Sequence, residues 1–482
     1  MYHSLLVNSR FNTTRFKKLC CLLVIMSVYV LWWGWIRSFP MALTSDDALN
    51  FSRGVVRFSV LEFRPHFPGY PAFIGFARLA ANWVDTTVAP IWVSLLSAMM
   101  IPVLVARLVL LLSGSWTAAT FGCLLALGQP LLASIALSGL SDSAAIMLFL
   151  MALIAAMQQN NGWVGLWLGL MLATRPSYMP LAFAMLLVPY LGDRTGFTIR
   201  AYLQAGVVIA VIGVSCLLFI WAHDGAAYFE EGRRFTLGHF SIWGNTAEGN
   251  TNSLHQWYVS LSKGFGWAGI GSAALSLFCA MYSGLSSKSG LRVNHSASHE
   301  IKQKLALIAA IAGMYWLWVT VGQNPDNLRH WAPVLFLFLV VFSVQLALLA
   351  NSDIANEWLI NPAYICAVGA VLYCFTLGYQ TYSSVQRQAP IQQAIVWIKA
   401  HPQVNIVGTN YSVNLLRDQL VSYSIYDMYY PSSKWALRAA AKQAPKSAWR
   451  LSGTRLDQQT LVTQFLPRFI GERRLFLYQI SQ

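Results

Sequence analysis

Residues 19–49, LCCLLVIMSVYVLWWGWIRSFPMALTSDDAL, combine an uninterrupted apolar run with an acidic pair shortly after it. The run from Leu19 to Ile36 is close to the roughly 20 apolar residues that a helix needs to cross a bilayer. Basic residues precede the run and a tryptophan cluster ends it, which is typical of a helix whose basic end stays in the cytoplasm. Asp46 and Asp47 are therefore predicted at the outer membrane face, where ionisable residues are functional candidates.

The composition predicts an α-helical, multi-pass membrane protein. Of the 482 residues, 56% are apolar and only 11% are charged, against roughly 25% charged residues in a soluble domain. The first apolar run resembles a signal peptide but lacks a small-x-small cleavage motif, so we expect a retained helix. All seven cysteines fall inside apolar segments, so neither a disulfide framework nor a zinc site is predicted.

The apolar segments predict about eleven spans and an outer C-terminus. The block 162–191 is divided into two short helices because Thr174-Arg175-Pro176-Ser177 interrupts it, and a charged residue before a proline is unfavourable against lipid. The basic residues of the short inner loops favour this topology, whereas the basic tail would also suit the cytoplasm. After the first helix the predicted spans are 88–112, 116–137, 142–157, the two halves of 162–191, 202–222, 264–284, 305–322, 331–350 and 359–380.

Two domains are predicted. Residues 1–380 form the membrane domain, whose first outer loop, 37–87, carries surface helices at Phe51–Leu61 and Pro68–Val84. Residues 381–482 form a small outer α/β domain with a partly parallel sheet and no glycine fingerprint for a dinucleotide. Its predicted strands are 404–408, 420–426, 447–451 and 474–480, and its predicted helices end at 400 and cover 412–417, 433–443 and 457–465.

Unusual polar residues of the membrane domain are predicted to gather at the outer face. Some lie in the first outer loop, and others begin, interrupt or adjoin spans. Because distant segments supply them to one face, we expect a site built from several helices and one long loop. The set comprises Asp46, Asp47, Arg53, Arg57, Arg64, His66, Asp142, Arg175, Arg329 and His330.

The carboxylates are suited to general-base or metal chemistry, and Asp46, Asp47 and Asp142 are the catalytic candidates. A carboxylate beside a hydroxyl group accepts its proton as the oxygen attacks. Repulsion between adjacent carboxylates raises the pKa of one of them unless a cation or an arginine intervenes. A divalent cation, Mg²⁺ or Mn²⁺, held by Asp46 and Asp47 stays an open alternative. Helix capping is the structural alternative for the pair and for Asp142.

The arginines are suited to phosphate, because guanidinium groups bind phosphate oxygens bidentately and stay charged. Arg175 and Arg329 are the stronger candidates, since they interrupt or adjoin apolar helices. For Arg53 and Arg57 the alternative is that they reach lipid headgroups.

His66 lies in RPHFPGYP, residues 64–71, where three prolines and a glycine exclude a regular helix. The sequence therefore predicts a fixed, irregular turn around this histidine. A histidine in such a turn suits phosphate, sugar or metal binding, and the alternative is a simple hydrogen bond.

The order of these motifs resembles the GT-C superfamily of membrane glycosyltransferases, and most of all its bacterial aminoarabinose and mannosyl transferases. The acidic pair followed by His66-Phe67-Pro68 is similar to the family's first outer loop with its His-Pro-Pro segment. Ser141-Asp142 matches its second acidic position. Leu172-Ala173-Thr174-Arg175-Pro176 is similar to its Leu-Thr-Lys/Arg segment, and Arg329-His330-Trp331-Ala332-Pro333 to its Arg-Tyr-x-x-Pro stretch. The departures, His-Phe-Pro and Arg-His, concern the subfamily and the sugar.

This resemblance, which covers residues 15 to about 350, implies an inverting hexosyl- or pentosyltransferase. The donor is a sugar on a polyprenyl-phosphate carrier, and the acceptor is a lipid, a glycan or a protein. One of Asp46 or Asp47 deprotonates the acceptor hydroxyl, while the arginines and His66 hold the leaving phosphate. Membrane lipids are further partners, and no nucleic acid is expected. The implied location is the bacterial inner membrane, with the site and the tail on the periplasmic side.

Two rival functions use the same charges. A transporter or flippase for lipid-linked glycans would place charged residues through the depth of the bilayer, whereas here they gather at one face. A polymerase or ligase of lipid-linked glycans would also act at the outer face, usually with arginines and histidine rather than an acidic pair near the first helix.

Overall fold

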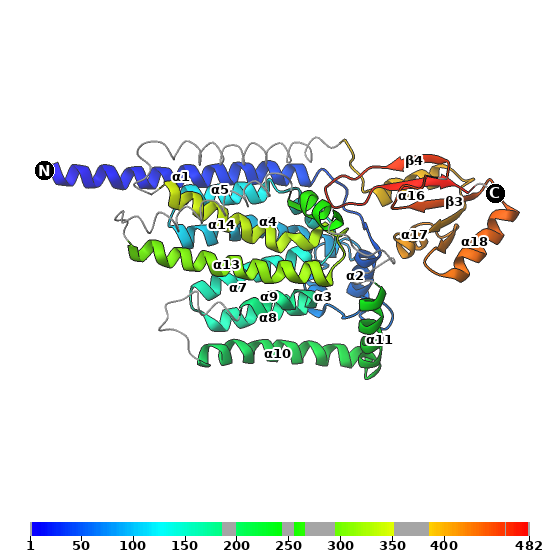
Figure 1. Cartoon of the computed structure of the whole chain (residues 1–482), viewed down its shortest axis with the longest axis horizontal. Coiled ribbons are helices and arrows are strands. Elements are labelled where there is room, and N and C mark those ends of the chain that lie inside the picture. The colour runs from blue at the N-terminus through cyan, green and yellow to red at the C-terminus, as the bar shows by residue number, and fades with distance from the viewer. Residues whose placement is uncertain are drawn as a thin grey trace.

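The computed structural model describes residues 2–185, 199–242, 255–265, 295–350, 385–457 and 459–480. Helices run side by side along the long axis, and a small domain with a sheet sits at one end of the bundle (Figure 1). The N-terminus lies at the opposite end. The predicted span 359–380 and nearly all of 264–284 lie outside the described residues, as does the end of the block 162–191.

Five helices of the described chain are long and apolar enough to cross a membrane. The chain is therefore a multi-pass membrane protein, as predicted, and the total of eleven spans stays a prediction. These helices are α1 (Tyr2–Ile36), α4 (Ala89–Ser113), α10 (Ile199–Asp224), α13 (His295–Gly322) and α14 (Ala332–Ala350).

Shorter helices fill the centre of the bundle. The segment predicted as the span 116–137 is helical but bent, because the chain turns by 61° between α5 (Trp116–Leu127) and α6 (Pro130–Ala136). Pro130 begins α6 and has no N–H group with which to continue α5. The helix α7 (Asp142–Met157) packs against α4 and α8 (Asn161–Thr174), and α8 packs against α10.

The predicted break at Arg175 is confirmed. The helix α8 ends at Thr174, and a short 3-10 turn, η1 (Pro176–Tyr178), leads into α9 (Met179–Ala184). Arg175 has an extended backbone between the two helices. Its side chain therefore lies at the end of α8 beside the start of α7.

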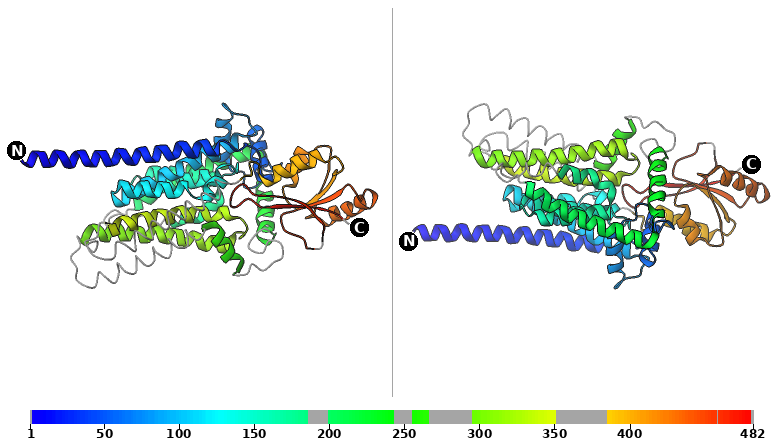
Figure 2. Two further views of the ribbon diagram at one scale, coloured as in Figure 1. Left: turned by 90° about the horizontal axis from the view of Figure 1, so that it is seen from above. Right: turned by 90° about the horizontal axis from the view of Figure 1, so that it is seen from below.

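The loop 37–87, which the sequence predicts to be outer, and the tail lie at the same end of the bundle. The loop contains α2 (Asp46–Val56) and α3 (Pro71–Ala80), and α11 (Ala227–Ile242) crosses this end at a large angle to the bundle (Figures 1 and 2). The aromatic rings of Phe51 and Phe73 pack edge to face at a centroid distance of 4.9 Å and are fully buried. Burial of such rings fixes α2 on α3.

The tail forms a five-stranded mixed sheet in the order β2-β1-β3-β5-β4. The strands β1 (Ile406–Thr409), β2 (Ser424–Asp427) and β3 (Ala448–Ser452) are parallel, and β4 (Leu461–Phe465) and β5 (Leu475–Gln479) complete the sheet antiparallel. The predicted partly parallel sheet is confirmed. Three helices flank it: α16 (Pro390–Ala400), α17 (Val413–Gln419) and α18 (Pro431–Gln443).

The helix predicted over 457–465 is wrong, because its second half is the strand β4. The segment Leu461-Val462-Thr463-Gln464-Phe465 pairs with β5, so that Phe465 lies opposite Leu475. β-Branched and aromatic residues favour a strand when a neighbouring strand is available.

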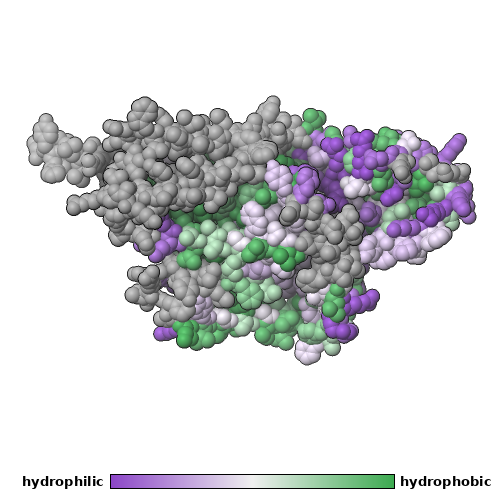
Figure 3. Space-filling view, viewed as in Figure 1, coloured by the Kyte–Doolittle hydropathy of each residue, from purple (hydrophilic) through white to green (hydrophobic). Residues whose placement is uncertain are grey.

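The surface of the bundle differs in character from that of the tail. On the face shown in Figure 3, hydrophilic side chains gather over the tail, and apolar side chains cover much of the described part of the bundle. The side chains of α10 are largely exposed along its length, including Leu203, Val207 and Val211. An apolar helix with an exposed apolar surface is suited to lipid contact.

Candidate active site

The acidic pair occupies the first turn of α2. The side chain of Ser45 caps this helix by accepting a hydrogen bond from the backbone N–H of Ala48 at 3.2 Å. Carboxylates in the first turn are stabilised by the helix dipole. Successive residues of a helix point about 100° apart, so Asp46 and Asp47 face different neighbours.

An irregular loop between α2 and α3 positions His66. Backbone hydrogen bonds join Ser59 and Arg64 in both directions, at 2.7 and 2.8 Å, and close the loop. Gly69 has a φ of +101°, and a Cβ there would lie 2.9 Å from a methyl carbon of Val60. The predicted fixed turn is confirmed. Glycine is suited to position 69 because it adopts a positive φ without strain and has no Cβ to collide with Val60.

Five titratable side chains lie in a row in which basic groups alternate with carboxylates. We call this row the charge chain, and its members are, in order, His66, Asp47, Arg329, Asp142 and Arg175. His66 Nδ1 lies 3.8 Å from Asp47 Oδ1, and Arg329 Nη2 lies 3.7 Å from Asp47 Oδ2. Arg329 Nε lies 4.0 Å from Asp142 Oδ2, and Arg175 Nη2 lies 3.0 Å from Asp142 Oδ1. Four segments that are distant in the sequence supply these residues. Towards the His66 end the charge chain is accessible at Asp47, and at the other end it is buried at Arg175.

The buried end is fixed by helix termini. Asp142 begins α7 and its side chain is 1% exposed, while the Arg175 side chain is 9% exposed. Arg175 Nη1 also donates to Ser141 Oγ at 3.2 Å. Desolvated charges of this kind are tolerated only as hydrogen-bonded pairs.

The accessible end depends on the 3-10 turn η5 (Leu328–Trp331), which precedes α14. Arg329 lies on this turn beside the buried His330, and Trp331 anchors the turn by donating from its indole N–H to Ser260 Oγ at 2.9 Å. The Asp47 side chain is 42% exposed and the Arg329 side chain 27% exposed. A solvent-borne or lipid-borne group therefore has access to this end.

Arg53, Arg57 and Arg64 stand outside the charge chain. Arg57 Nη2 donates to Glu62 Oε1 at 2.5 Å, and Arg64 Nε lies 3.5 Å from Glu62 Oε2. Arg53 donates to Asp418 of the tail. All three pair with carboxylates outside the charge chain, two of them with the same Glu62, and none of the three forms an ion pair with the acidic members of the charge chain.

The two adjacent aspartates have pKa values that move in opposite directions. Burial raises the pKa of Asp46 above its ordinary value, although backbone N–H groups of the tail act against this. Partial removal from water also acts to raise the pKa of Asp47, but His66, Arg329 and Arg175 outweigh it and lower the pKa. The site therefore favours the ionised form of Asp47 specifically.

The surroundings of His66 favour its neutral form. Burial lowers its pKa below the ordinary value, against the effect of Asp47. Burial also raises the pKa of the Tyr70 hydroxyl to about 12, so Tyr70 stays protonated. Tyr70 Oη lies 3.2 Å from His66 Nε2. When Tyr70 donates to Nε2, the tautomer of His66 that carries its proton on Nδ1 directs that proton towards Asp47.

No family profile and no curated protein matches the sequence. Among solved structures, ArnT from Cupriavidus metallidurans superposes over 95% of this chain and 98% of its own, with a TM-score of 0.53 at 13% identity. The oligosaccharyltransferase of Archaeoglobus fulgidus superposes over 91% of this chain and 70% of its own, with a TM-score of 0.51 at 11% identity.

This chain has the GT-C fold. The expected fold class is thus confirmed, including a mostly helical membrane region and a small C-terminal sheet. One structure of ArnT is bound to undecaprenyl phosphate, with a TM-score of 0.54. One of the Archaeoglobus fulgidus structures is in complex with Zn and sulfate. At identities of 11 to 13% these likenesses concern the fold.

The residues around Asp46 and Asp47 do not fit the divalent cation that the sequence left as an alternative there. Cations such as Mg²⁺ require several oxygen ligands around one point. Asp46 accepts a hydrogen bond from the tail instead, and Arg329 stands between Asp47 and Asp142. In the part of the chain that the structure describes, no group of three or more His, Cys, Asp or Glu side chains converges.

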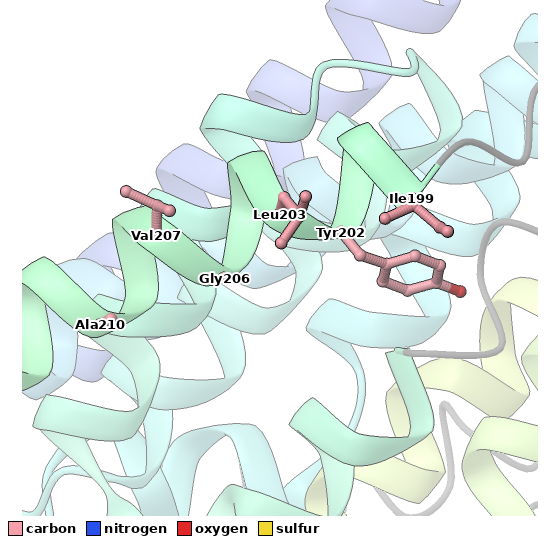
Figure 4. Close-up of a pocket in the computed structure, with 6 residues that line it drawn as sticks. All are labelled: Ile199, Tyr202, Leu203, Gly206, Val207 and Ala210. Atoms are coloured by element: carbon pink, nitrogen blue, oxygen red, sulfur yellow. The ribbon is translucent and has the colours of Figure 1, made fainter.

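An apolar groove with a volume of about 360 Å³ lies along the start of α10 and is separate from the charge chain. Figure 4 shows its lining, Ile199, Tyr202, Leu203, Gly206, Val207 and Ala210. Asp224, at the other end of α10, accepts hydrogen bonds from the first outer loop, from Ser59 Oγ and the Val60 N–H. Because an α-helix rises 1.5 Å per residue, the groove begins roughly 20 Å along α10 from the end that carries Asp224.

Sequence reasoning missed the polar side chains that surround the charge chain. Tyr178 lies beneath Arg175, whose guanidinium carbon is 5.3 Å from the ring centroid, and Tyr315 packs edge to face on Tyr178. Thr174 is fully buried, and its hydroxyl has no hydrogen-bond partner among the described residues. A search of the apolar blocks for every hydroxyl near Arg175 would have found Thr174 and Tyr178.

Proposed function

We propose that this protein is a membrane glycosyltransferase. It transfers a sugar from a polyprenyl-phosphate carrier to a hydroxyl group of a lipid, glycan or protein acceptor, with inversion at the anomeric carbon. The reaction takes place at the outer face, and we assign the protein to the bacterial inner membrane with its tail in the periplasm. The GT-C fold and the bound undecaprenyl phosphate of a protein with the same fold support the lipid carrier.

The charge chain is the observation that carries the proposal. It joins one accessible carboxylate, Asp47, to a buried pair, Asp142 and Arg175, through Arg329. In the described part of the chain the Nε atoms of both arginines are buried and have no hydrogen-bond partner. Guanidinium groups with donors that still lack a hydrogen bond are suited to an anionic group such as phosphate.

Asp47 is the proposed general base. The acceptor O–H gives its proton to Asp47 as its oxygen forms a bond to the anomeric carbon. The bond between that carbon and the phosphate oxygen breaks on the opposite side, which inverts the configuration, and the electron pair leaves with the carrier phosphate. A carboxylate held ionised by Arg329 and His66 is ready for this step, although its lowered pKa makes it a weaker base before the donor binds.

Arg329 and Arg175 are the proposed phosphate ligands. Negative charge develops on the carrier phosphate as the sugar departs, and guanidinium groups that are already in place stabilise it. His66 Nδ1 lies 3.8 Å from Asp47 Oδ1 and so borders the proposed position of the phosphate, whereas for His330, which follows Arg329 in η5 and is buried, a contact with the phosphate stays a prediction. No step is assigned to a metal ion.

Binding of the carrier tests this assignment without knowledge of the sugar. Arg329→Gln is expected to weaken binding of undecaprenyl phosphate at least about tenfold, since a charge-assisted hydrogen bond contributes roughly 1.5–3 kcal/mol. Native mass spectrometry of the purified protein measures the bound fraction. Arg57→Gln is the matched control, because Arg57 pairs only with Glu62 among the described residues and should bind as the wild type does. Equal loss in both variants would place the phosphate elsewhere.

The pH dependence of transfer gives an independent check. Activity requires ionised Asp47, so it falls as the pH drops through the pKa of this group. Arg329 holds that pKa below the ordinary carboxyl value; in Arg329→Gln the pKa rises, and the acid limb of the kcat/KM profile should move to higher pH. The profile of Arg57→Gln should match that of the wild type. An unmoved acid limb in Arg329→Gln would show that another group is the base.

A further inference from the structure

The helix α17 of the tail is capped by a residue from the first outer loop. Asp46 Oδ1 accepts a hydrogen bond from the backbone N–H of Leu415 at 2.8 Å, across 369 residues of sequence. Leu415 is in the first turn of α17, where N–H groups lack partners within the helix. The residue before α17, Ser412, makes no side-chain capping hydrogen bond. Asp46 therefore does for α17 what an N-cap residue ordinarily does.

A second contact joins the same two helices. Arg53 Nη2 donates to Asp418 Oδ1 at 2.8 Å. Arg53 follows Asp46 by seven residues, which is two turns of helix, so both side chains lie on one face of α2. Asp47 is rotated away from this face towards Arg329 and His66. One face of α2 thus holds the tail, and an adjacent face presents Asp47 to the charge chain.

The tail also reaches the other side of the charge chain. Arg473 Nη2 lies 3.2 Å from Asp326 Oδ2, in the segment that leads into Arg329. Nearby, Gly471 has a φ of +98°, and a Cβ there would lie 3.2 Å from Ser134 Oγ and 3.8 Å from Leu328. The tail therefore contacts both elements that carry the Asp47–Arg329 pair, α2 and η5.

We infer that the acidic pair is divided in function: Asp47 belongs to the active site, while Asp46 is a positioning residue that fastens the tail to the helix carrying Asp47. The contacts of Asp46, Arg53 and Arg473 bracket the accessible end of the charge chain from α2 to η5. They hold Asp47 opposite Arg329. A capping role requires only an acceptor oxygen at position 46, so asparagine should serve there, whereas a base or a metal ligand requires a carboxylate.

Hydrogen exchange on the full chain in nanodiscs tests the fastening without any substrate. In Asp46→Ala the amides of residues 413–416 should exchange roughly two- to thirtyfold faster than in the wild type, the range expected when a cap is lost. Asp46→Asn should exchange as the wild type does. Asp85→Ala is the control, because Asp85 is an exposed acid that caps its own turn at Thr87. Unchanged exchange in Asp46→Ala would overturn the inference.

Two further measurements keep the inference falsifiable. If Asp46→Ala does not fold, Arg53→Gln should still raise exchange in α17, whereas Arg57→Gln should not.

The activity measurement rests on the proposed function: Asp46→Asn should retain polyprenyl phosphate release, and Asp47→Asn should lose it. Equal loss in both asparagine variants would make Asp46 a reacting group or a metal ligand. Hydrogen exchange does not depend on transfer, so failure of the proposed function would leave that measurement standing.

Discussion

Replacement of Asp47 by asparagine is expected to lower the rate of sugar transfer by on the order of a hundred- to ten-thousand-fold, the usual contribution of a positioned general base. The amide keeps the shape of the side chain but cannot accept the acceptor proton. Because Asp47 is partly exposed, the free energy of unfolding should change little. Transfer is measured as polyprenyl phosphate released from a radiolabelled lipid-linked donor.

Asp85→Asn is the matched control for this variant. Asp85 also lies in the first outer loop, and its carboxylate accepts from the Thr87 backbone N–H, remote from the charge chain. It should leave transfer unchanged. Full activity in Asp47→Asn would remove Asp47 from the chemistry and leave Asp142 as the remaining acidic member of the charge chain.

Loss of one partner of the buried pair should have the largest effect on stability. Arg175→Gln leaves the Asp142 carboxylate in a desolvated position with only the longer contact to Arg329. Removal of one member of a buried ion pair typically costs about 3–5 kcal/mol. Thermal unfolding in detergent should therefore show a much lower midpoint for this variant than for the wild type.

The double variant Asp142→Asn with Arg175→Gln separates stability from function. Two neutral amides leave no unpaired charge, so most of the lost stability should return. Carrier binding should not return, because Arg175 is a proposed phosphate ligand. A double variant as unstable as Arg175→Gln would mean that the pair acts through packing with Tyr178 rather than through its charges.

The sequence was most informative where a polar residue interrupts an apolar pattern. Arg175 breaks an apolar block, and this break correctly predicted the end of α8. Arg329 adjoins an apolar helix, and the structure brings it between Asp47 and Asp142. Such residues are costly near a bilayer unless partners compensate them, so their presence alone indicates a shared site.

The sequence did not show which residues pair with partners far away along the chain. Arg53, Arg57 and Arg64 have the same residue type as Arg175, and only the fold reveals their separate partners, Asp418 and Glu62. The sequence placed Asp46 and Asp47 together, whereas helix geometry turns them to different neighbours. The strand β4 was predicted as a helix because its pairing with β5 is invisible in a local pattern.

The most direct test of the account follows both products of one reaction. Purified protein in nanodiscs is given polyprenyl-phosphate-linked hexose and pentose donors together with candidate acceptors. The account predicts that free polyprenyl phosphate and glycosylated acceptor form in equal amounts, as measured by mass spectrometry. It also predicts that the sugar on the acceptor has the anomeric configuration opposite to that in the donor, as determined by NMR. The account would be contradicted if no donor yielded polyprenyl phosphate and if, in vesicles, the intact donor only moved from one leaflet to the other. That result would indicate a transporter.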